Sequence, residues 1–419
     1  MAGSLFAATA SLLGASAGPS IAQEADRPWA FDASLSYYGE EERVKDGSFG
    51  LHVTRRLKGG SLSLRLAVDT LTGPSASGAA PSLRPQTFTA PSGDDRYQIG
   101  AREKVLDPTF LDTRFAGALS WSQPLGARGE ADVGLSVSSE YDYLHLGANG
   151  RYALSLNERN TTVALGIAFA RDTLRPVGGA PIPFAPMLPV GRHDNKLGHE
   201  SKTVADLLVG ITQVLGRQTI GELNYSFSRS SGYLTDPYKI LSVLDPATGD
   251  LTPGPGLPGL YLFEHRPDRR AKHSLFAQVK HRFGGPIADV SYRFMTDDWG
   301  VVSHTVDFRF RQPIGETWYL QPHLRWYRQS AADFYRPYLL NGDPLPEHAS
   351  ADYRLGGLDA YTVGVKVGVP HRGTRELSVR VEYYRQEGRG PEGAAFGLLT
   401  GLDLFPTLNA LIGQLEYRF

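Results

Sequence analysis

The sequence predicts an all-β fold: a transmembrane antiparallel up-and-down β-barrel of about 16 strands with short periplasmic turns and long extracellular loops. Three observations predict it. Segments of about ten residues that alternate apolar and polar side chains recur along most of the chain. Short and long connectors alternate between these segments. The last segment, 411–419, has apolar side chains at almost every second position and stops at Phe419.

Length and composition favour a single all-β unit over the two or three soluble domains that 419 residues could form. Gly and Tyr are plentiful and Cys is absent, which suits an oxidising envelope and excludes thiolate metal sites and Cys nucleophiles. The net charge of -1 gives no basis for nucleic-acid binding. Beyond the N-terminus no apolar run approaches the roughly 20 residues of a membrane helix, so a membrane-spanning form must be a closed barrel.

Residues 1–22 are predicted to be a signal peptide, followed by one barrel domain over 23–419. Residues 5–17 are apolar and small, and Ala22 before Gln23 resembles a cleavage site. No Lys or Arg precedes the apolar stretch, so either the true start lies upstream or the signal is weak. A buried helix is the alternative, which Pro19 and the abundance of Ala, Ser and Gly disfavour.

The first half of the predicted barrel contains eight strands with one apolar face each. Leu62, Leu64 and Leu66, for example, alternate with Ser63 and Arg65. We expect a tight hairpin near residues 142–145. The predicted strands cover residues 29–38, 48–57, 62–69, 112–123, 132–142, 144–156, 163–169 and 203–215.

The second half contains eight more strands of the same kind and ends on the terminal segment, which supplies the closing strand. Val306, Phe308 and Phe310 alternate with Asp307 and Arg309 in one of them. The predicted strands cover residues 222–227, 275–283, 289–294, 306–311, 317–328, 352–369, 377–383 and 411–419.

Connector lengths set the orientation. Every second connector is a short turn, and the long connectors fall on the opposite side, which indicates turns in the periplasm and loops outside. A soluble β-sandwich or propeller is the alternative fold, but it does not explain the signal, the terminal Phe and this asymmetry together. The short turns are predicted at 58–60, 126–130, 157–160, 216–218, 284–286, 312–316 and 371–374.

The two faces of the strands predict two environments. The apolar face must contact lipid, with aromatic side chains near strand ends at the level of the headgroups. The charged face must point into a lumen that is wide enough for water at this strand number. The aromatic candidates are Tyr37, Trp121, Tyr141, Trp318, Trp326 and Tyr383.

The candidate functional residues are charged side chains of the lumen and the outer mouth. Arg293, Arg309 and Arg325 on nearby strands would favour anions. The alternative is a charge-neutralised ladder of these arginines with Asp289 and Asp307. Further candidates at the mouth are Asp236, Asp297 and Asp298.

The sequence predicts no enzymatic activity, metal or cofactor. His273-Ser274 and Ser303-His304 have residue types of a hydrolase, but adjacent strand residues point to opposite faces. Two groups have the residue types of a cation site without a recognisable spacing: His193, Asp194, His199 and Glu200, and Asp297 and Asp298 with His304 and His145.

Several segments resemble a family of proteobacterial outer-membrane proteins known as domain of unknown function 3570. The resemblance rests on residues 232–239, 266–268, 272–274, 292–300 and 330–335. It implies a barrel in the outer membrane of a Gram-negative bacterium. It also implies a periplasmic redox or lipoprotein partner, since family members tend to be encoded near a flavin-transferring lipoprotein and a thioredoxin-like protein.

Two functions follow as hypotheses. The first is a channel or transporter for a small solute or an exported product, its mouth narrowed by loops that carry segments 233–239, 297–299 and 333–335. The alternative is a non-conducting scaffold for periplasmic redox or lipoprotein partners. In either case the expected partners are outer-membrane lipid, lipopolysaccharide and, through the terminal strand ending in Phe419, the barrel-assembly machinery.

Overall fold

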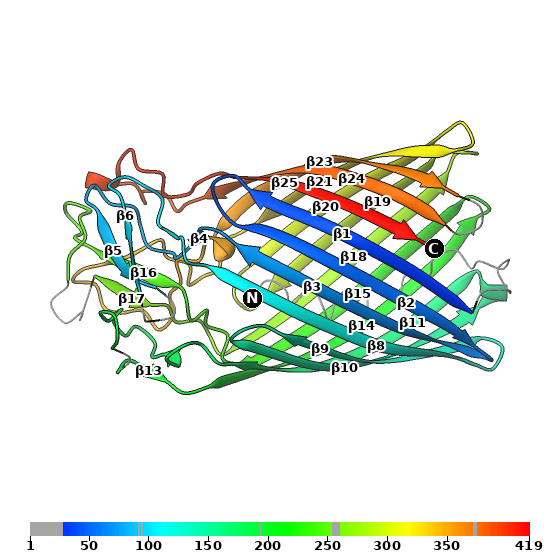
Figure 1. Ribbon diagram of the computed structural model, residues 1–419, viewed down its shortest axis with the longest axis horizontal. Coiled ribbons are helices and arrows are strands. Elements are labelled where there is room, and N and C mark those ends of the chain that lie inside the picture. The colour runs from blue at the N-terminus through cyan, green and yellow to red at the C-terminus, as the bar shows by residue number, and fades with distance from the viewer. Residues whose placement is uncertain (1–27, 91–92, 94, 193, 254–259, 372–374) are drawn as a thin grey trace.

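The protein is a closed antiparallel β-barrel with a folded cap over one end (Figure 1). The computed structural model describes residues 28–90, 93, 95–192, 194–253, 260–371 and 375–419. The predicted fold class and the count of sixteen barrel strands are confirmed. Within the described residues, no helix is long and apolar enough to cross a membrane. The predicted signal peptide, residues 1–22, lies outside the described part of the chain.

Each barrel strand pairs with the next barrel strand along the chain, as expected for an up-and-down topology. The strands are 11 to 17 residues long. The lipid core needs only about 9–11 residues per strand, so the strands extend beyond it. In order they are β1 (Trp29–Glu40), β2 (Lys45–Leu57), β3 (Gly60–Thr72), β8 (Leu111–Leu125), β9 (Gly129–Ser139), β10 (Tyr143–Leu156), β11 (Thr161–Leu174), β14 (Glu200–Gly216), β15 (Thr219–Gly232), β18 (Arg269–Arg282), β19 (Ile287–Asp297), β20 (Val302–Ile314), β21 (Trp318–Gln329), β23 (Gly357–Pro370), β24 (Glu376–Arg389) and β25 (Leu408–Arg418).

The terminal segment closes the barrel, as its alternation predicts. Strand β25 pairs with β24 on one side and with β1 on the other. Phe31 and Phe419 exchange two backbone hydrogen bonds, with N–O distances of 3.0 and 2.9 Å. The Phe419 ring stacks on Phe31 and Tyr417, with centroids 5.1 and 5.3 Å apart. The chain therefore ends in paired backbone at the end of the barrel opposite the cap (Figure 1).

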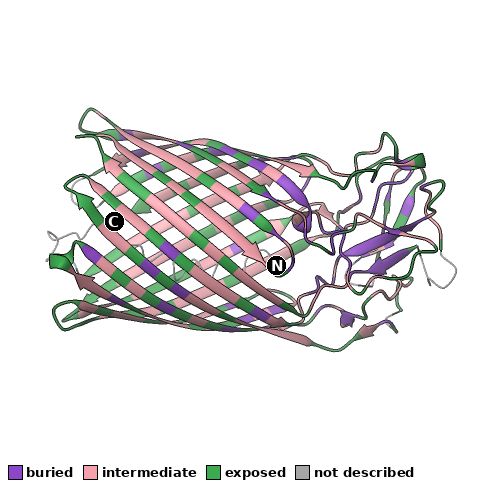
Figure 2. Ribbon diagram, turned by 180° about the vertical axis from the view of Figure 1, so that it is seen from behind, coloured by how far each residue is buried: buried purple, intermediate pink, exposed green. Residues whose placement is uncertain are grey.

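The outer surface of the barrel is apolar at alternate positions, which gives the chequered exposure in Figure 2. Leu66, Leu135, Ile167 and Val363 are 44, 64, 60 and 56 % exposed, which is unusual for large apolar residues. The predicted aromatic positions Tyr37, Trp121, Tyr141, Trp318 and Tyr383 are exposed as well. Such a surface is stable only against lipid, so the outward face is the membrane-contacting face.

The connectors confirm six of the seven short turns and partly confirm the long loops; most of the turn predicted at 371–374 lies outside the described residues. The end opposite the cap has turns of a few residues, including the 3-10 turn η1 (Asn157–Arg159). At the other end, three connections are short hairpins at residues 41–44, 140–142 and 298–301. The expectation that every connector on this side is long is therefore wrong, although the tight hairpin near residue 142 was expected. Backbone pairing extends to the rim at these three places.

The long connectors fold into the cap, which has its own small sheets and apolar clusters. The strands are β4 (Ser75–Ala76), β5 (Gln86–Thr89), β6 (Arg96–Ile99), β7 (Leu106–Asp107), β12 (Ala180–Pro181), β13 (Lys196–Leu197), β16 (Ile240–Leu244), β17 (Tyr261–Phe263) and β22 (Leu339–Leu340). Leu241, Val243 and Leu262 are fully buried at one centre. A second buried apolar cluster contains Phe88, Tyr97 and other residues. Figure 2 accordingly shows buried strands in the cap, besides the scattered buried positions of the barrel wall.

One predicted strand begins too early. The sequence placed its start at residue 352, but β23 begins at Gly357. The Asp352 side chain accepts a hydrogen bond from the Arg354 backbone N–H at 3.0 Å and caps the 3-10 turn η2 (Tyr353–Leu355). A capped turn holds the backbone out of the extended conformation, so the strand starts after it. Residues 352–355 belong to the cap.

Leu66→Arg should lower the free energy of unfolding in lipid vesicles by about 2–4 kcal/mol, because Leu66 is in the middle of β3 on the lipid-facing side. Ala67→Arg is the matched control, since Ala67 is the next residue and faces the lumen. Its cost should be less than about 1 kcal/mol. Denaturant titration of vesicle-folded protein measures both. Equal losses would contradict the assignment of the two faces.

Candidate functional site

A chamber of about 1280 Å³ lies where the cap meets the inner wall of the barrel. Barrel strands supply one part of its lining, including Tyr38, Asp69, Asp112, Arg325, Tyr327 and Tyr384. The cap supplies the rest, including Tyr97, Asn195, Tyr238, Tyr353 and Arg354. A volume of this size, lined by charged, aromatic and aliphatic side chains, is sufficient for a small solute.

Carboxylates outnumber lysines and arginines in the lining of the chamber. Asp112, Glu140 and Asp142 approach one another at β8 and the hairpin between β9 and β10. Burial raises the pKa of Glu140 and of Asp142, and the negative charge of Asp112 raises both further. Asp142 also accepts a hydrogen bond from the Tyr238 hydroxyl. This part of the wall is therefore rich in acceptor oxygens.

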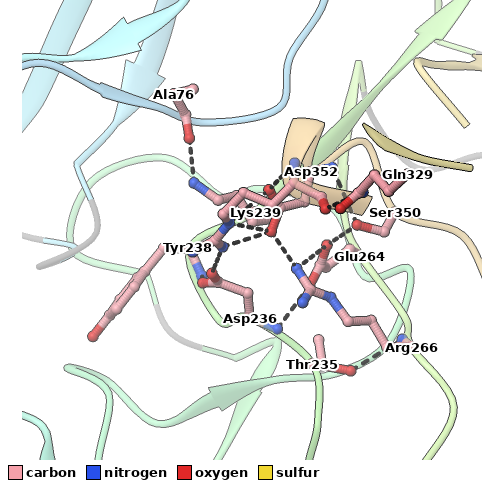
Figure 3. A network of polar contacts seen from close by, with 11 residues as sticks. Ala76, Thr235, Asp236, Tyr238, Lys239, Glu264, Arg266, Gln329, Ser350 and Asp352 are labelled. Carbon is pink, nitrogen blue, oxygen red and sulfur yellow. Dashed lines mark hydrogen bonds and ion pairs between the residues drawn. The ribbon is translucent and has the colours of Figure 1, made fainter. Parts of the chain in front are cut away.

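A buried network of charges holds the cap together (Figure 3). At its centre is Asp352, which is 1 % exposed. Arg354 donates to both Asp352 oxygens, with Nε at 2.8 and 2.9 Å. The Arg266 guanidinium contacts Asp352 at 2.8 Å and Glu264 at 2.6 Å. Arg354 also reaches Asp236 at 2.7 Å, so two guanidinium groups link three carboxylates.

The charges of the network are balanced by Lys239, which is 7 % exposed. Burial alone would raise the pKa of Asp352 and Asp236, but the neighbouring cations outweigh it and hold both values below the usual range. Burial also lowers the pKa of Lys239 and raises that of Glu264. Buried ions are tolerated only when they are paired and hydrogen-bonded. The network meets this requirement with three cations and three carboxylates.

The network joins segments that are far apart in the sequence. Asp236, Lys239, Glu264 and Arg266 lie between β15 and β18, and Asp352 lies between β21 and β23. Lys239 donates to the backbone oxygen of Ala76 in the β3–β8 connector. Ser350 donates to Glu264. The polar contacts therefore fasten three loops to one another over the chamber.

On the barrel wall, the predicted lumen residues form an ionic ladder across β20, β21 and β24. Asp307 pairs with Arg309 at 3.3 Å and with His323 Nε2 at 2.9 Å. The other ring nitrogen of His323 lies 2.9 Å from Glu382, which pairs with Arg380 at 3.2 Å. Around Asp307 and Arg309 the structure therefore has the charge-neutralised ladder, not the free arginine patch.

The remaining three lumen candidates are not part of this ladder. Asp289 pairs with Lys280 at 3.6 Å and accepts from Gln278 at 2.7 Å. Arg293 lies over the Phe276 ring, 5.3 Å from its centroid. Arg325 lines the chamber. Within the described residues neither Arg293 nor Arg325 has a carboxylate within 4.0 Å. The three arginines thus have three different environments.

The mouth candidates have structural roles. Asp236 belongs to the buried network. Asp297 pairs with Arg270 at 2.5 Å and accepts from the backbone N–H groups of Trp299 and Val301 at 3.1 and 2.9 Å. Gly300 completes this hairpin at φ +79°, where an added Cβ would lie 2.2 Å from Asp333. Asp298 accepts from the Ala271 backbone N–H at 2.8 Å. The mouth aspartates thus stabilise the rim and the cap.

The histidine candidates do not meet at one place. His145 is 2 % exposed and lies 2.7 Å from Asp172 inside the barrel wall. His304 contacts the Tyr292 hydroxyl at 2.7 Å on the lipid-facing side. His273 contacts Tyr225 at 2.8 Å on the same side. Among the described residues no three His, Asp or Glu side chains are placed to hold a metal ion, and His193 lies outside them.

Sequence reasoning missed most of the charge network. Glu264, Arg266, Asp352 and Arg354 were not candidates, because they lie in two connectors 86 residues apart. The segments 232–239 and 266–268, which carry the family resemblance, were the available signal. They contain Asp236 and Arg266, which both contact Glu264.

Comparison with known proteins identifies a family. The family model "Protein of unknown function (DUF3570)" matches residues 2–419. This chain belongs to the DUF3570 family. The expected membership is confirmed over the whole barrel and cap. A search of curated proteins finds no match to this DUF3570 chain.

Solved structures resemble the DUF3570 chain only distantly. A bacterial polysaccharide outer membrane secretin has 8 % identity and a TM-score of 0.46, with coverage of 94 % of this chain and 100 % of the other. The siderophore receptor PirA of Pseudomonas aeruginosa has 6 % identity, a TM-score of 0.41 and coverage of 87 and 57 %. A mutant of the ferric enterobactin receptor PfeA from the same organism has 12 % identity and a TM-score of 0.44. The match covers 94 % of this chain and 61 % of the receptor. The chain spans little more than half the length of these receptors.

Arg266→Met should loosen the cap and leave the barrel folded. Removing Arg266 leaves Glu264 and Asp352 with less compensation, and breaking a buried ion pair costs about 3–5 kcal/mol. Limited proteolysis and hydrogen exchange at residues 240–244 measure the effect. Arg192→Met is the control, because Arg192 and Asp194 are 63 and 71 % exposed and such pairs contribute about 0–1 kcal/mol. Equal protection in both variants would contradict the role of the network.

Proposed function

We propose that this protein is a channel or transporter in the outer membrane of a Gram-negative bacterium, which moves a small solute or an exported product past a mouth narrowed by the cap. The observation that carries the proposal is the chamber of about 1280 Å³ between the cap and the inner wall of the barrel. A purely structural barrel would not need a space of this size at its mouth, lined by charged and aromatic side chains.

The inner wall is suited to a hydrated route. Charged side chains of both signs line it, and the ladder from Arg309 to Arg380 neutralises many of them in place. Fixed ion pairs keep a lumen polar without binding a passing solute strongly. The cap then controls access, because a solute must enter the chamber between loops that the buried charges fasten together. Cap loosening is the step that would open the route to the outside.

The surroundings of the barrel support the outer-membrane assignment. The apolar band would contact lipid, and arginines at the outer ends of β21 and β24 would face lipopolysaccharide phosphates. Arg328 and Arg389 there lie 3.7 and 3.2 Å from Asp359. The exposed Leu411, Leu415 and Tyr417 of β25 and the final Phe419 offer the surface that the barrel-assembly machinery would receive.

Single-channel conductance in planar bilayers tests the proposal. The unmodified protein should give small ohmic steps, since the cap restricts the mouth. Arg266→Met should give steps several-fold larger, because the loops separate. Arg385→Met should match the unmodified protein, since Arg385 and Glu387 form an exposed pair that does not line the chamber.

Absence of steps in all three proteins, with correctly folded barrels, would contradict the channel. It would favour the non-conducting scaffold for periplasmic redox or lipoprotein partners. Co-purification of such a partner from envelope extracts would then be the next measurement.

A further inference from the structure

Some carboxylates of the chamber have a Lys or Arg partner, and others have none among the described residues. Asp46, Asp112, Glu140 and Asp142 line one side, and among the described residues none of the four has a Lys or Arg nitrogen within 4.0 Å. The nearby Arg114 is held by Asp69, with N–O distances of 2.7 and 2.5 Å. One oxygen of Asp112 and one of Asp46 have no hydrogen-bond partner. This wall lacks the positive charge that the buried network has.

A second observation, independent of the acids, comes from the cap. Asn195 lines the same chamber and is only 8 % exposed. Its amide nitrogen donates to the Pro186 backbone oxygen, which fixes the side chain. Its amide oxygen has no hydrogen-bond partner among the described residues. A buried acceptor without a donor is destabilising unless a ligand satisfies it.

The chamber also offers aromatic surface. Tyr38 is paired with Asp46 across β1 and β2, so an aromatic side chain neighbours one of these acids. Tyr38, Tyr327 and Tyr384 line the chamber on β1, β21 and β24. Their hydroxyl groups donate to Glu40, Gln329 and Gln386 at 2.9, 2.6 and 2.8 Å. Because these hydroxyls are satisfied within the protein, what the tyrosines offer a solute is mainly their ring surface.

The cations of the chamber are mostly committed to protein partners. Arg354 is bound by Asp352 and Asp236, and Arg192 by Asp194. Lys239 and Lys196 donate to backbone oxygens. An anionic solute would therefore find few available donors beyond Arg325 in the described residues. A solute that donates hydrogen bonds and carries positive charge meets complementary groups.

We propose that the chamber binds a small organic cation, an amine attached to an apolar or aromatic body. The ammonium group would lie against Asp112 and Glu140 and the body against the Tyr38 ring, while the Asn195 amide oxygen would accept a further hydrogen bond from the solute. Carboxylates compensate the charge, and aromatic faces attract a cation. This inference rests on the proposed channel function and names the class of its solute.

The test is calorimetric titration of the detergent-solubilised full chain with benzylamine, benzyl alcohol and benzoate, with micelle blanks. The three probes share a ring and differ in charge. Benzylamine should bind, benzyl alcohol should bind on the order of tenfold more weakly, and benzoate should not bind. Equal binding of the amine and the alcohol would overturn the proposal.

Variants locate the site. Asp112→Asn with Glu140→Gln should weaken benzylamine binding on the order of tenfold and leave benzyl alcohol binding unchanged. Asn195→Leu, which leaves the carboxylates intact, should also weaken benzylamine binding. Asp343→Asn with Glu392→Gln removes the same charge from exposed outer loops and should have no effect. Equal effects of the two double variants would show attraction by net charge alone and overturn the assigned site.

The two proposals fail separately. Benzylamine binding without conductance would contradict the channel and keep the cation site. Ohmic steps with no preference of the chamber for benzylamine would keep the channel and contradict the cation site. Heat-modifiable migration on gels identifies folded protein in each variant, so a lost signal is not attributed to misfolding.

Discussion

The rest of the structure depends on the pairing of β25 with β1. In lipid, every backbone N–H and C=O must find a partner within the protein, and a sheet with open edges leaves two rows of them exposed. The terminal strand removes both edges at once, and the two hydrogen bonds between Phe31 and Phe419 extend the pairing to the last residue. Once the sheet is closed, alternate side chains must point to lipid or to the lumen. The apolar outer face and the charged inner face follow from that condition.

The cap is stabilised in a different way from the barrel. Its stability comes from enclosed apolar clusters and a balanced set of buried charges, as in a small soluble domain. Leu241, Val243 and Leu262 are fully buried, and each contributes about 1.5–3 kcal/mol through burial. Asp352 and Arg266 add specificity, because a charge out of place in such an interior is costly. The protein thus combines a lipid-exposed sheet with a water-exposed lid that has its own interior.

Much of the barrel could be predicted from the sequence, because each transmembrane strand has a two-residue period that a short segment displays on its own. Strand β20 is an example, with Phe308 and Phe310 outside and Asp307 and Arg309 inside. The cap could not be predicted in this way. Its apolar runs at Ile240–Leu244 and Tyr261–Phe263 are short and lie inside Pro- and Gly-rich connectors, so they resemble loop sequence.

The candidate site was predicted least well, for a related reason. Asp289, Asp307 and Arg309 could be assigned to the lumen from alternation, but the pairs that they form also depend on residues of other strands. His323 bridges Asp307 and Glu382, a pairing that no local pattern indicates. Asp297 was read as part of the mouth, whereas its side chain fixes a hairpin. Alternation gives the direction of a side chain and not its partner.

The way the charge network joins distant loops has a consequence for the order of assembly. Arg354 and Asp236 are separated by 118 positions, and Lys239 and Ala76 by 163. Contacts of such separation form late, because a long stretch of chain must first be ordered between them. The network cannot be complete until β21 and β23 have joined the sheet and carried Asp352 to the rim. The cap therefore cannot become native before the strands that carry its loops to the rim are in the sheet, so its assembly follows that of most of the barrel wall.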